Sequence, residues 1–67
     1  MRINKRKLKI AMANVCMNTA DLQKVADIPR PTLDGAMQGK GVSPKTMGKI
    51  ARALGIQPSE ILVDEKE

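Results

Sequence analysis

Residues 18–39, which read NTADLQKVADIPRPTLDGAMQG, decide the fold of this chain. Two short apolar runs flank a break that contains two prolines. Their residues are Leu22, Val25 and Ala26 before the break, and Leu33, Ala36 and Met37 after it. In each run the apolar residues fall at positions i, i+3 and i+4, which form one face of a short amphipathic helix. Two such helices joined by a turn of a few residues make a helix-turn-helix.

The first helix of the pair has a clear start signal. Asn18 can accept a hydrogen bond from the backbone, and Asp21 three residues on can return one, which is a variant of the capping box. This pattern predicts a helix over residues 19–26. Asp27 opens the turn, and aspartate adopts a left-handed conformation more readily than most residues.

Prolines set the start of the second helix. Ile28 and Arg30 each precede a proline, which favours extended backbone at both positions. Pro31 suits the first helical position, so a helix is predicted over residues 31–38 with Arg30 at its N-cap. Gly39 follows it and can supply a left-handed cap.

A further helix is predicted before the pair, over residues 5–16, with Asn4 as its cap. Its apolar residues recur at helical spacing. They predict a buried stripe of Leu8, Ala11, Met12 and Val15. Free cysteine is commonly buried and inert, so Cys16 at the end of this helix is expected to pack in the core.

Two more helices are predicted after the pair. Ser43 followed by Pro44 is a strong start signal, and it predicts a helix over residues 44–54 that Gly55 ends. A short fifth helix should begin at about Pro58. No strand pattern or internal repeat is present, so the fold class is all-α, with five short helices in one compact bundle.

Length and charge indicate one basic domain. The 67 residues are expected to form a single domain, with residues 1–4 as a basic amino-terminal arm and residues 64–67 as a charged, frayed tail. The chain has 12 Lys and Arg against 7 Asp and Glu, and a net charge of +5 favours a polyanionic partner such as nucleic acid. Five of the cations lie among the first nine residues. Phosphate contact and a solvated, mobile terminus both account for that cluster.

Residue types that carry other functions are scarce. With no histidine and one cysteine, we expect no metal, cofactor or small-molecule site, and a reducing, cytoplasmic location. No apolar run approaches the ~20 residues of a membrane span. No paired carboxylates or phosphate-cradling glycine motif indicates an enzyme. The absence of aromatic residues disfavours RNA or single-strand binding, because no side chain can stack on bases.

Two segments resemble the phage-repressor (Cro/CI-type, or XRE) helix-turn-helix family, whose fold is lambda-repressor-like. They are TADLQKVADIPRPTL, residues 19–33, and the more diagnostic GKGVSPKTMGKIARALGI, residues 39–56. The resemblance covers about residues 8–62. Two positions depart from the family pattern: Gln23 stands where alanine is usual, and Asp27 stands where glycine is usual.

The resemblance implies that the helix over residues 31–38 lies in the major groove of double-stranded DNA. The implied base-facing residues are Arg30, Pro31, Thr32, Asp34 and Gly35, and the helical wheel adds Gln38. Arg30 can pair with guanine, while Asp34 can either accept from a cytosine amine or repel phosphates. Gly35 either lets the helix backbone approach the groove closely or marks low selectivity.

Phosphate contacts should supply most of the affinity. The candidates lie at the starts of helices and in the loop after the helix over residues 31–38. They are Thr19, Lys40, Gly41, Lys45 and Thr46. Backbone N–H groups at a helix start suit an anion. An ordinary solvated loop is the alternative for Lys40 and Lys45. Lys49 and Arg52 lie further along the helix over residues 44–54 and are interpreted as plain surface.

The leading hypothesis is a cytoplasmic, sequence-specific DNA-binding transcriptional regulator, and a repressor in particular. The resemblance also implies a weak homodimer on pseudo-palindromic half-sites, with helices four and five as the expected contact surface. The alternative is a protein-binding adaptor or antitoxin-like module on the same fold. The sparse face around Asp34 and Gly35 motivates that alternative.

Overall fold

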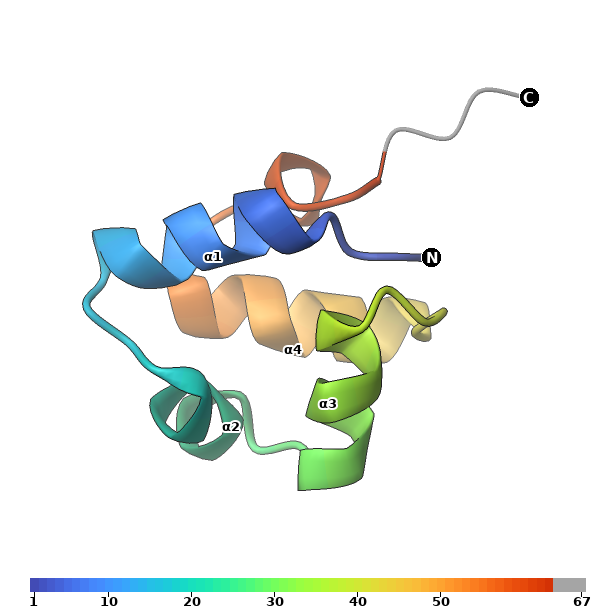
Figure 1. The fold of residues 1–67 in the computed structure, drawn as a ribbon, viewed down its shortest axis with the longest axis horizontal. Coiled ribbons are helices and arrows are strands. Elements are labelled where there is room, and N and C mark those ends of the chain that lie inside the picture. Colours follow the sequence, from blue (N-terminus) through green and yellow to red (C-terminus); the bar gives the residue numbers. More distant parts are fainter. Residues whose placement is uncertain (64–67) are drawn as a thin grey trace.

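The computed structural model describes residues 1–63, so the tail expected over residues 64–67 lies outside the described residues. Its elements are α1 (Lys5–Asn14), α2 (Thr19–Ala26), α3 (Arg30–Met37), α4 (Pro44–Leu54) and a 3-10 turn, η1 (Pro58–Glu60) (Figure 1). The prediction of an all-helical fold is confirmed for this part of the chain. The predicted fifth helix is wrong, because it is a single 3-10 turn.

The chain leaves helical geometry after Glu60 because the next residues pair with the amino terminus. Ile3 and Leu62 form an isolated antiparallel bridge. In it, the Asn4 N–H donates to the Ile61 carbonyl at 2.7 Å, and the Val63 N–H donates to the Arg2 carbonyl at 2.9 Å. Extended backbone is needed for this pairing, so a longer fifth helix cannot form.

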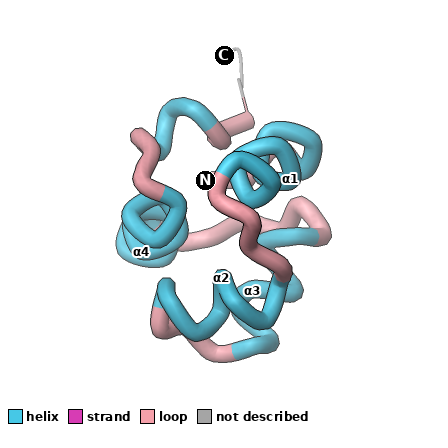
Figure 2. Tube along the Cα trace, turned by 90° about the vertical axis from the view of Figure 1, so that its left-hand side faces the viewer, coloured by secondary structure: helices cyan, strands magenta, loops and turns pink. Residues whose placement is uncertain are grey.

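The helices surround one apolar core. Figure 1 shows α1 and α4 running across the molecule, with α2 and α3 together at one end (also Figure 2), and α4 packs against both α2 and η1. Each α-helix contributes side chains that are fully buried or nearly so. They include Leu8, Leu22, Leu33, Met47 and Ile50, and Ile61, which directly follows η1, is equally buried. Among the described residues no polar or charged residue is buried, so packing of aliphatic side chains holds the fold together.

Two predicted core residues are exposed instead. Val15 is the C-cap of α1, which ends earlier than predicted, and its side chain is 41% exposed. Val25 is 55% exposed. Leu22 and Ala26 are the buried residues of α2, and because a helix turns about 100° per residue, Val25 points outward.

Predicted caps are confirmed at several helix ends. Asn4 accepts from the Lys7 N–H at 3.1 Å, and the Asn18–Asp21 capping box is complete. Ser43 caps α4 through the Thr46 N–H at 3.2 Å. Asp27 adopts the left-handed conformation, with a φ of 56°. Local side-chain chemistry therefore sets most of the boundaries.

Cys16 is exposed, which contradicts the prediction that it packs in the core. It lies just past α1 with a φ of 56°. Its N–H donates to the Ala13 carbonyl at 3.1 Å, and the Met17 N–H donates to the Met12 carbonyl at 3.0 Å. These two bonds form a Schellman motif, whose left-handed position normally holds glycine. Cys16 therefore lies in the turn that follows α1 and is exposed to solvent, rather than on the buried face of the helix.

Replacing Cys16 with glycine should stabilise the protein. A side chain in the left-handed region is unfavourable by about 1 kcal/mol, and glycine removes that strain. We expect Cys16→Gly to raise the free energy of unfolding by about this amount in urea titrations. Cys16→Ala is the control, because alanine keeps the Cβ atom. An equal gain for both variants would contradict this account.

The first residues of the chain lie against the body of the fold. Ile3 is only 1% exposed and belongs to the core. The Val42 N–H donates to the Met1 carbonyl at 2.6 Å, and the Met1 nitrogen donates back to the Val42 carbonyl at 3.2 Å. The segment expected as a basic arm thus bridges the loop after α3 and residues 61–63 (Figure 1). It ties the loop that follows the helix-turn-helix to the carboxyl-terminal part of the described chain.

Candidate nucleic-acid interface

α3, the helix expected to contact DNA bases, begins one residue earlier than predicted. Pro29, rather than Arg30, is the N-cap of α3, and its carbonyl accepts the Leu33 N–H at 3.1 Å. Arg30 and Pro31 are the first two helical residues. Proline is tolerated there because the N–H groups of a first turn have no partner within the helix.

The predicted base-facing residues share the outer side of α3. Leu33 and Ala36 are fully buried and fix the rotation of the helix. Away from the core lie the six residues singled out from the sequence. Arg30, Pro31 and Gln38 are exposed, and Thr32, Asp34 and Gly35 are half-buried. Gln38 is the C-cap of α3 rather than its last helical residue.

Arg30 and Asp34 form an ion pair on this face. The Arg30 Nε lies 3.0 Å from the Asp34 Oδ1, and the two side chains are 52% and 49% exposed. A pair this exposed contributes at most a few tenths of a kcal/mol to stability, roughly 0.3–0.5. Its effect is on geometry, because it holds the guanidinium along the helix and occupies one oxygen of the carboxylate. The i, i+4 spacing of the two residues is a signal for this pair in the sequence, although only separate roles were predicted for them.

The chain after α3 folds back over the reading helix. The Lys40 N–H donates to the Gly35 carbonyl at 3.0 Å, and the Gly39 N–H donates to the Ala36 carbonyl at 3.1 Å. Gly39 has a φ of 86° in this Schellman motif, as predicted for a left-handed cap. The side chain of Lys40 crosses Gly35, since a Cβ atom placed there would lie 3.7 Å from the Lys40 Cδ. One predicted phosphate contact therefore lies directly beside the base-facing side of α3.

Lys5 joins this region from the start of α1. Its Cε would lie 3.6 Å from a Cβ atom placed on Gly39. From the sequence, Lys5 was expected only as a member of the amino-terminal basic cluster. No local pattern could bring it to the loop after α3, because the contact depends on how α1 packs. The structure thus adds Lys5 to the cations around Lys40.

The hydroxyls of Thr19 and Thr46, two of the predicted phosphate contacts, already form hydrogen bonds within the protein. The Thr19 hydroxyl donates to the Met37 sulfur at 3.7 Å, which links the start of α2 to the end of α3. The Thr46 N–H donates to the Ser43 hydroxyl, which also donates to the Thr46 hydroxyl at 3.1 Å. Gly41 and Lys45 are exposed, as are the neighbouring Lys40 and Ser43. The loop and the start of α4 thus offer Gly41 and Lys45 more directly than Thr46.

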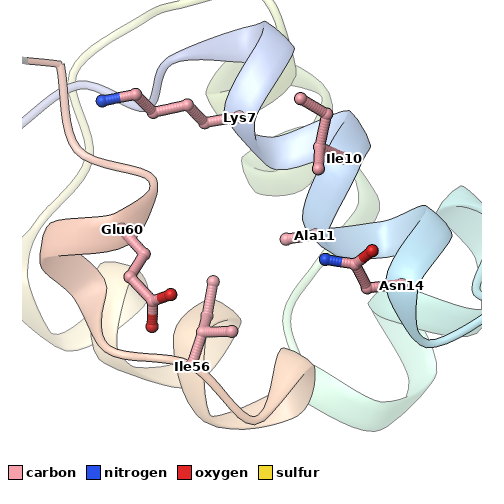
Figure 3. A pocket seen from close by; sticks show the side chains of 6 residues that line it. All are labelled: Lys7, Ile10, Ala11, Asn14, Ile56 and Glu60. Carbon is pink, nitrogen blue, oxygen red and sulfur yellow. The ribbon is translucent and has the colours of Figure 1, made fainter.

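A separate depression lies between α1 and η1, away from the helix-turn-helix (Figure 3). Its volume is about 140 Å³. It is lined by Lys7, Ile10, Ala11, Asn14, Ile56 and Glu60. Figure 3 shows Lys7, Ile10, Ala11 and Asn14 along α1, with Ile56 and Glu60 on the other side of the depression. Ile10 is 55% exposed, so this is an apolar patch with a charged rim.

Residues 1–63 contain neither a cluster of metal ligands nor a membrane-spanning helix. No group of three His, Cys, Asp or Glu side chains there is close enough to hold a metal ion. No helix in the same range has the length and apolar character to cross a bilayer.

The four helices and the outward face of α3 define a DNA-binding helix-turn-helix domain. A sequence profile of the Cro/C1-type HTH DNA-binding domain matches residues 7–67, and the chain belongs to this family. The expected resemblance is therefore confirmed. Domains of this family are typically non-enzymatic and occur in DNA-binding regulators. No curated protein matches the chain.

Two solved structures share the fold. One is PhpD with cadmium complexed with hydroethylphosphonate, at 25% sequence identity and a TM-score of 0.81. The other is native PhpD with cadmium atoms, at 25% identity and a TM-score of 0.82. Each match covers 100% of this chain and 15% of the PhpD chain. This chain therefore spans about one seventh of the length of these structural relatives.

Gly35 provides a direct test of how closely α3 must approach its target. An added methyl group would make only an ordinary contact with Lys40, so Gly35→Ala should stabilise α3 by up to about 1 kcal/mol. If close approach matters, DNA affinity should fall although the protein becomes more stable. Thermal unfolding and a duplex-binding titration on the same preparation measure both. If Gly35→Ala is more stable and binds DNA with unchanged affinity, close approach of α3 is excluded. Low sequence selectivity of the α3 face then explains Gly35.

Proposed function

We propose that this protein is a sequence-specific regulator of transcription that binds double-stranded DNA and acts as a repressor. The observation that carries the proposal is the half-exposed guanidinium of Arg30 at the start of α3, held by Asp34 one turn further on. In this proposal α3 enters the major groove and Arg30 makes the main base contact. A repressor is the simplest mode of action, because a domain bound over a promoter excludes polymerase by occupancy alone.

Asp34 supports base recognition by holding Arg30 rather than by reading a base itself. The bond to Asp34 is made by Arg30 Nε, so it does not use the two terminal nitrogens of the guanidinium, whose N–H groups suit the O6 and N7 atoms of guanine. Because the ion pair already restricts the Arg30 side chain, that side chain loses less conformational entropy when it binds DNA. The pairing also offsets the negative charge of Asp34, which reduces its repulsion of phosphates. Thr32 and Gln38 flank this contact and are candidates for neighbouring bases.

Phosphate contacts in the proposal come from the loop after α3 and its neighbours. Lys40 lies over Gly35, and Lys5 lies beside Gly39, so the two cations flank the edge of the reading helix. Gly41 and Lys45 continue the same surface toward α4. Thr19 and Thr46 remain candidates because they lie at the starts of α2 and α4, although their hydroxyls already form hydrogen bonds with Met37 and Ser43. Such contacts supply affinity that is independent of sequence and falls with salt.

Arg30, Asp34 and Lys40 should have distinguishable effects on binding. On a site selected from a random duplex library, Arg30→Ala should weaken binding by about 1–3 kcal/mol and lose discrimination against random DNA. Lys40→Ala should weaken specific and random binding alike. Asp34→Ala should lose discrimination despite the more favourable charge, whereas Asp34→Asn keeps an acceptor for Arg30 Nε and should retain it. Gel-shift titrations at fixed salt measure these effects.

Other outcomes would contradict these roles. Equal losses on specific and random DNA for Arg30→Ala would remove its role in base reading. Tighter specific binding by Asp34→Ala would show that Asp34 acts only as an unfavourable charge. In vitro transcription from a promoter that contains the selected site, with and without the protein, tests repression separately.

The alternative function is a protein-binding adaptor or antitoxin-like module on this fold. It is motivated by the short side chains around Asp34 and Gly35 on the reading face. A single stoichiometric protein partner, without salt-dependent DNA binding, would support it. The cadmium and hydroethylphosphonate of the PhpD structures belong to that much longer protein, and we propose neither ligand for this chain.

We also propose that the protein forms a weak homodimer, as two-fold operators require. The depression between α1 and η1 suits a two-fold contact, because apolar Ile10 and Ile56 line it together with the oppositely charged Lys7 and Glu60. Across a two-fold axis, Lys7 of one copy can face Glu60 of the other, and the same contact recurs in reverse. The surface lies at the predicted position of the fifth helix, away from α3.

Ile10→Asp should abolish self-association, since it places a charge in the middle of that contact. Sedimentation velocity over a concentration series, with and without DNA, measures it. Val25→Asp is the matched control, because Val25 is equally exposed on α2 and lies outside the depression. If Ile10→Asp and the wild type show the same concentration dependence, the dimer does not use this surface.

A further inference from the structure

Gly41 lies in the loop after α3 and leaves its backbone N–H group available. Among residues 1–63 this group donates no hydrogen bond, whereas the N–H groups of Gly39, Lys40 and Val42 all do. Gly41 itself is exposed. An exposed N–H group without a protein partner, next to a cation, suits an oxygen of a DNA phosphate. Gly41 is therefore a candidate that binds through its backbone alone.

The fold does not require glycine at position 41. The φ of Gly41 is not positive, unlike those of Gly39 and Gly55, which are 86° and 70°. A Cβ atom placed on Gly41 would lie 3.9 Å from the Met1 carbonyl oxygen, which is an ordinary contact. Neither conformation nor space accounts for the glycine. What the missing side chain does is leave the backbone open to a ligand.

The loop around Gly41 is held by different elements on its two sides. On one side the Lys40 N–H donates to the Gly35 carbonyl at 3.0 Å, so α3 itself fixes Lys40. On the other side Val42 pairs with Met1 in both directions, at 2.6 Å and 3.2 Å. Val42 also packs its side chain against the core, but both of its backbone groups are bound to residue 1. The position of Gly41 therefore depends on α3 and on the amino-terminal segment.

The amino-terminal segment can hold Val42 because Ile3 anchors it. Met1 is 49% exposed, whereas Ile3 is 1% exposed and belongs to the core. The backbone bridge between Ile3 and Leu62 fixes the segment from its other side. Figures 1 and 2 show the amino terminus level with α1 and above α3. Loss of the Ile3 side chain would therefore free Val42, while the bond between Lys40 and α3 remains.

We propose that Ile3 is a positioning residue for DNA binding: through the amino-terminal segment it holds the Gly41 N–H where that group can donate to a phosphate oxygen. Ile3 does not touch DNA, since its side chain is inside the core. The contact that it positions carries no net charge and reads no base. Ile3 should therefore contribute affinity that is the same for every sequence and that adds no cation to the interface. This inference rests on the proposed function, because it takes a DNA phosphate as the ligand.

The test compares the same substitution at two buried isoleucines. Ile3→Ala removes the anchor of the amino-terminal segment. Ile50→Ala is the matched control, because Ile50 is 0% exposed and lies on α4, outside the hydrogen bonds that hold the loop. Circular dichroism first establishes that both variants are folded at the temperature of the measurements. If Ile3→Ala does not fold, Ile3→Val and Ile50→Val replace the pair, and the same differences are expected on a smaller scale, since each removes only one carbon.

Hydrogen exchange in the free protein tests the positioning without DNA. The Val42 and Lys40 amides each donate one backbone bond, and NMR resolves them individually. Ile3→Ala should speed exchange at Val42 by roughly tenfold more than at Lys40, because only Val42 depends on Met1. Ile50→Ala lowers the stability of the whole domain and should alter the two amides alike. Equal changes at Val42 and Lys40 in Ile3→Ala would overturn the positioning role.

Binding titrations at several salt concentrations test the phosphate contact. Ile3→Ala should weaken binding to the selected site and to a random duplex by the same factor, roughly tenfold, as expected for one hydrogen bond to a charged group. The slope of log K against log salt should stay at the wild-type value, whereas Lys40→Ala should reduce it by about 0.9. DNA should slow exchange of the Gly41 amide in the wild type and in Ile50→Ala, but not in Ile3→Ala.

The remaining outcomes count against the inference. Wild-type affinity in Ile3→Ala, or a loss no larger than that of Ile50→Ala, would show that Ile3 is a core residue and nothing more. A reduced salt slope in Ile3→Ala would show that Ile3 acts through a cation rather than through Gly41. Both results leave the proposed function standing if Arg30→Ala still loses sequence discrimination. If the wild type binds no duplex at all, the proposed function fails and this inference fails with it.

Discussion

Burial of Leu33 and Ala36 is the constraint on which the rest of the molecule depends. Both side chains are inaccessible to solvent, and together they fix how α3 is rotated about its own axis. Rotation of α3 decides which residues point outward, and therefore that Arg30 and Asp34 meet on the surface. Without aromatic residues, the core relies on the fit of aliphatic side chains contributed by every helix, each of which stabilises the fold by about 1.5–3 kcal/mol.

Charge in this protein is arranged differently on its separate faces. On α3 one cation is paired with a carboxylate, which limits its freedom and prepares it for a directed contact. On α4 three cations are left without partners among the described residues, which suits contacts that depend on charge more than on direction. Between α1 and η1 a cation and a carboxylate line one depression with apolar side chains. The first arrangement corresponds to base reading, and the third corresponds to self-association, in the functions proposed here.

The amino-terminal segment connects parts of the chain that are far apart in sequence. Met1 pairs with Val42 in the loop after α3, and Asn4 pairs with Ile61 near the end of the described chain. Ile3 anchors these contacts in the core. Because the loop holds Lys40 and Gly41, the first residues help to place the proposed phosphate contacts. The structure thereby joins the basic amino terminus to the side of the molecule proposed to bind DNA.

Local chemistry in the sequence determined the helices and most of their ends. The apolar spacing of residues 18–39 and the caps at Asn4, Asn18 and Ser43 act within one or two turns, so they can be read without knowing the fold. Apolar spacing of this kind wrongly predicted that Val15, at the end of the first helix, and Val25, in the second, would be buried. Periodicity shows that a residue is apolar at a helical interval, but only packing decides whether a neighbour covers it.

Tertiary structure alone decided the features that depend on distant segments. It ended the fifth helix after one turn, because residues 61–63 pair with the amino terminus. It turned Cys16 outward in a left-handed position and carried Lys5 to Gly39. The sequence by itself determined the family, the two-helix unit and the candidate reading residues, since these reside in contiguous stretches. The relative placement of Lys5 and Lys40 required the packed core, because no interaction between neighbouring residues encodes it.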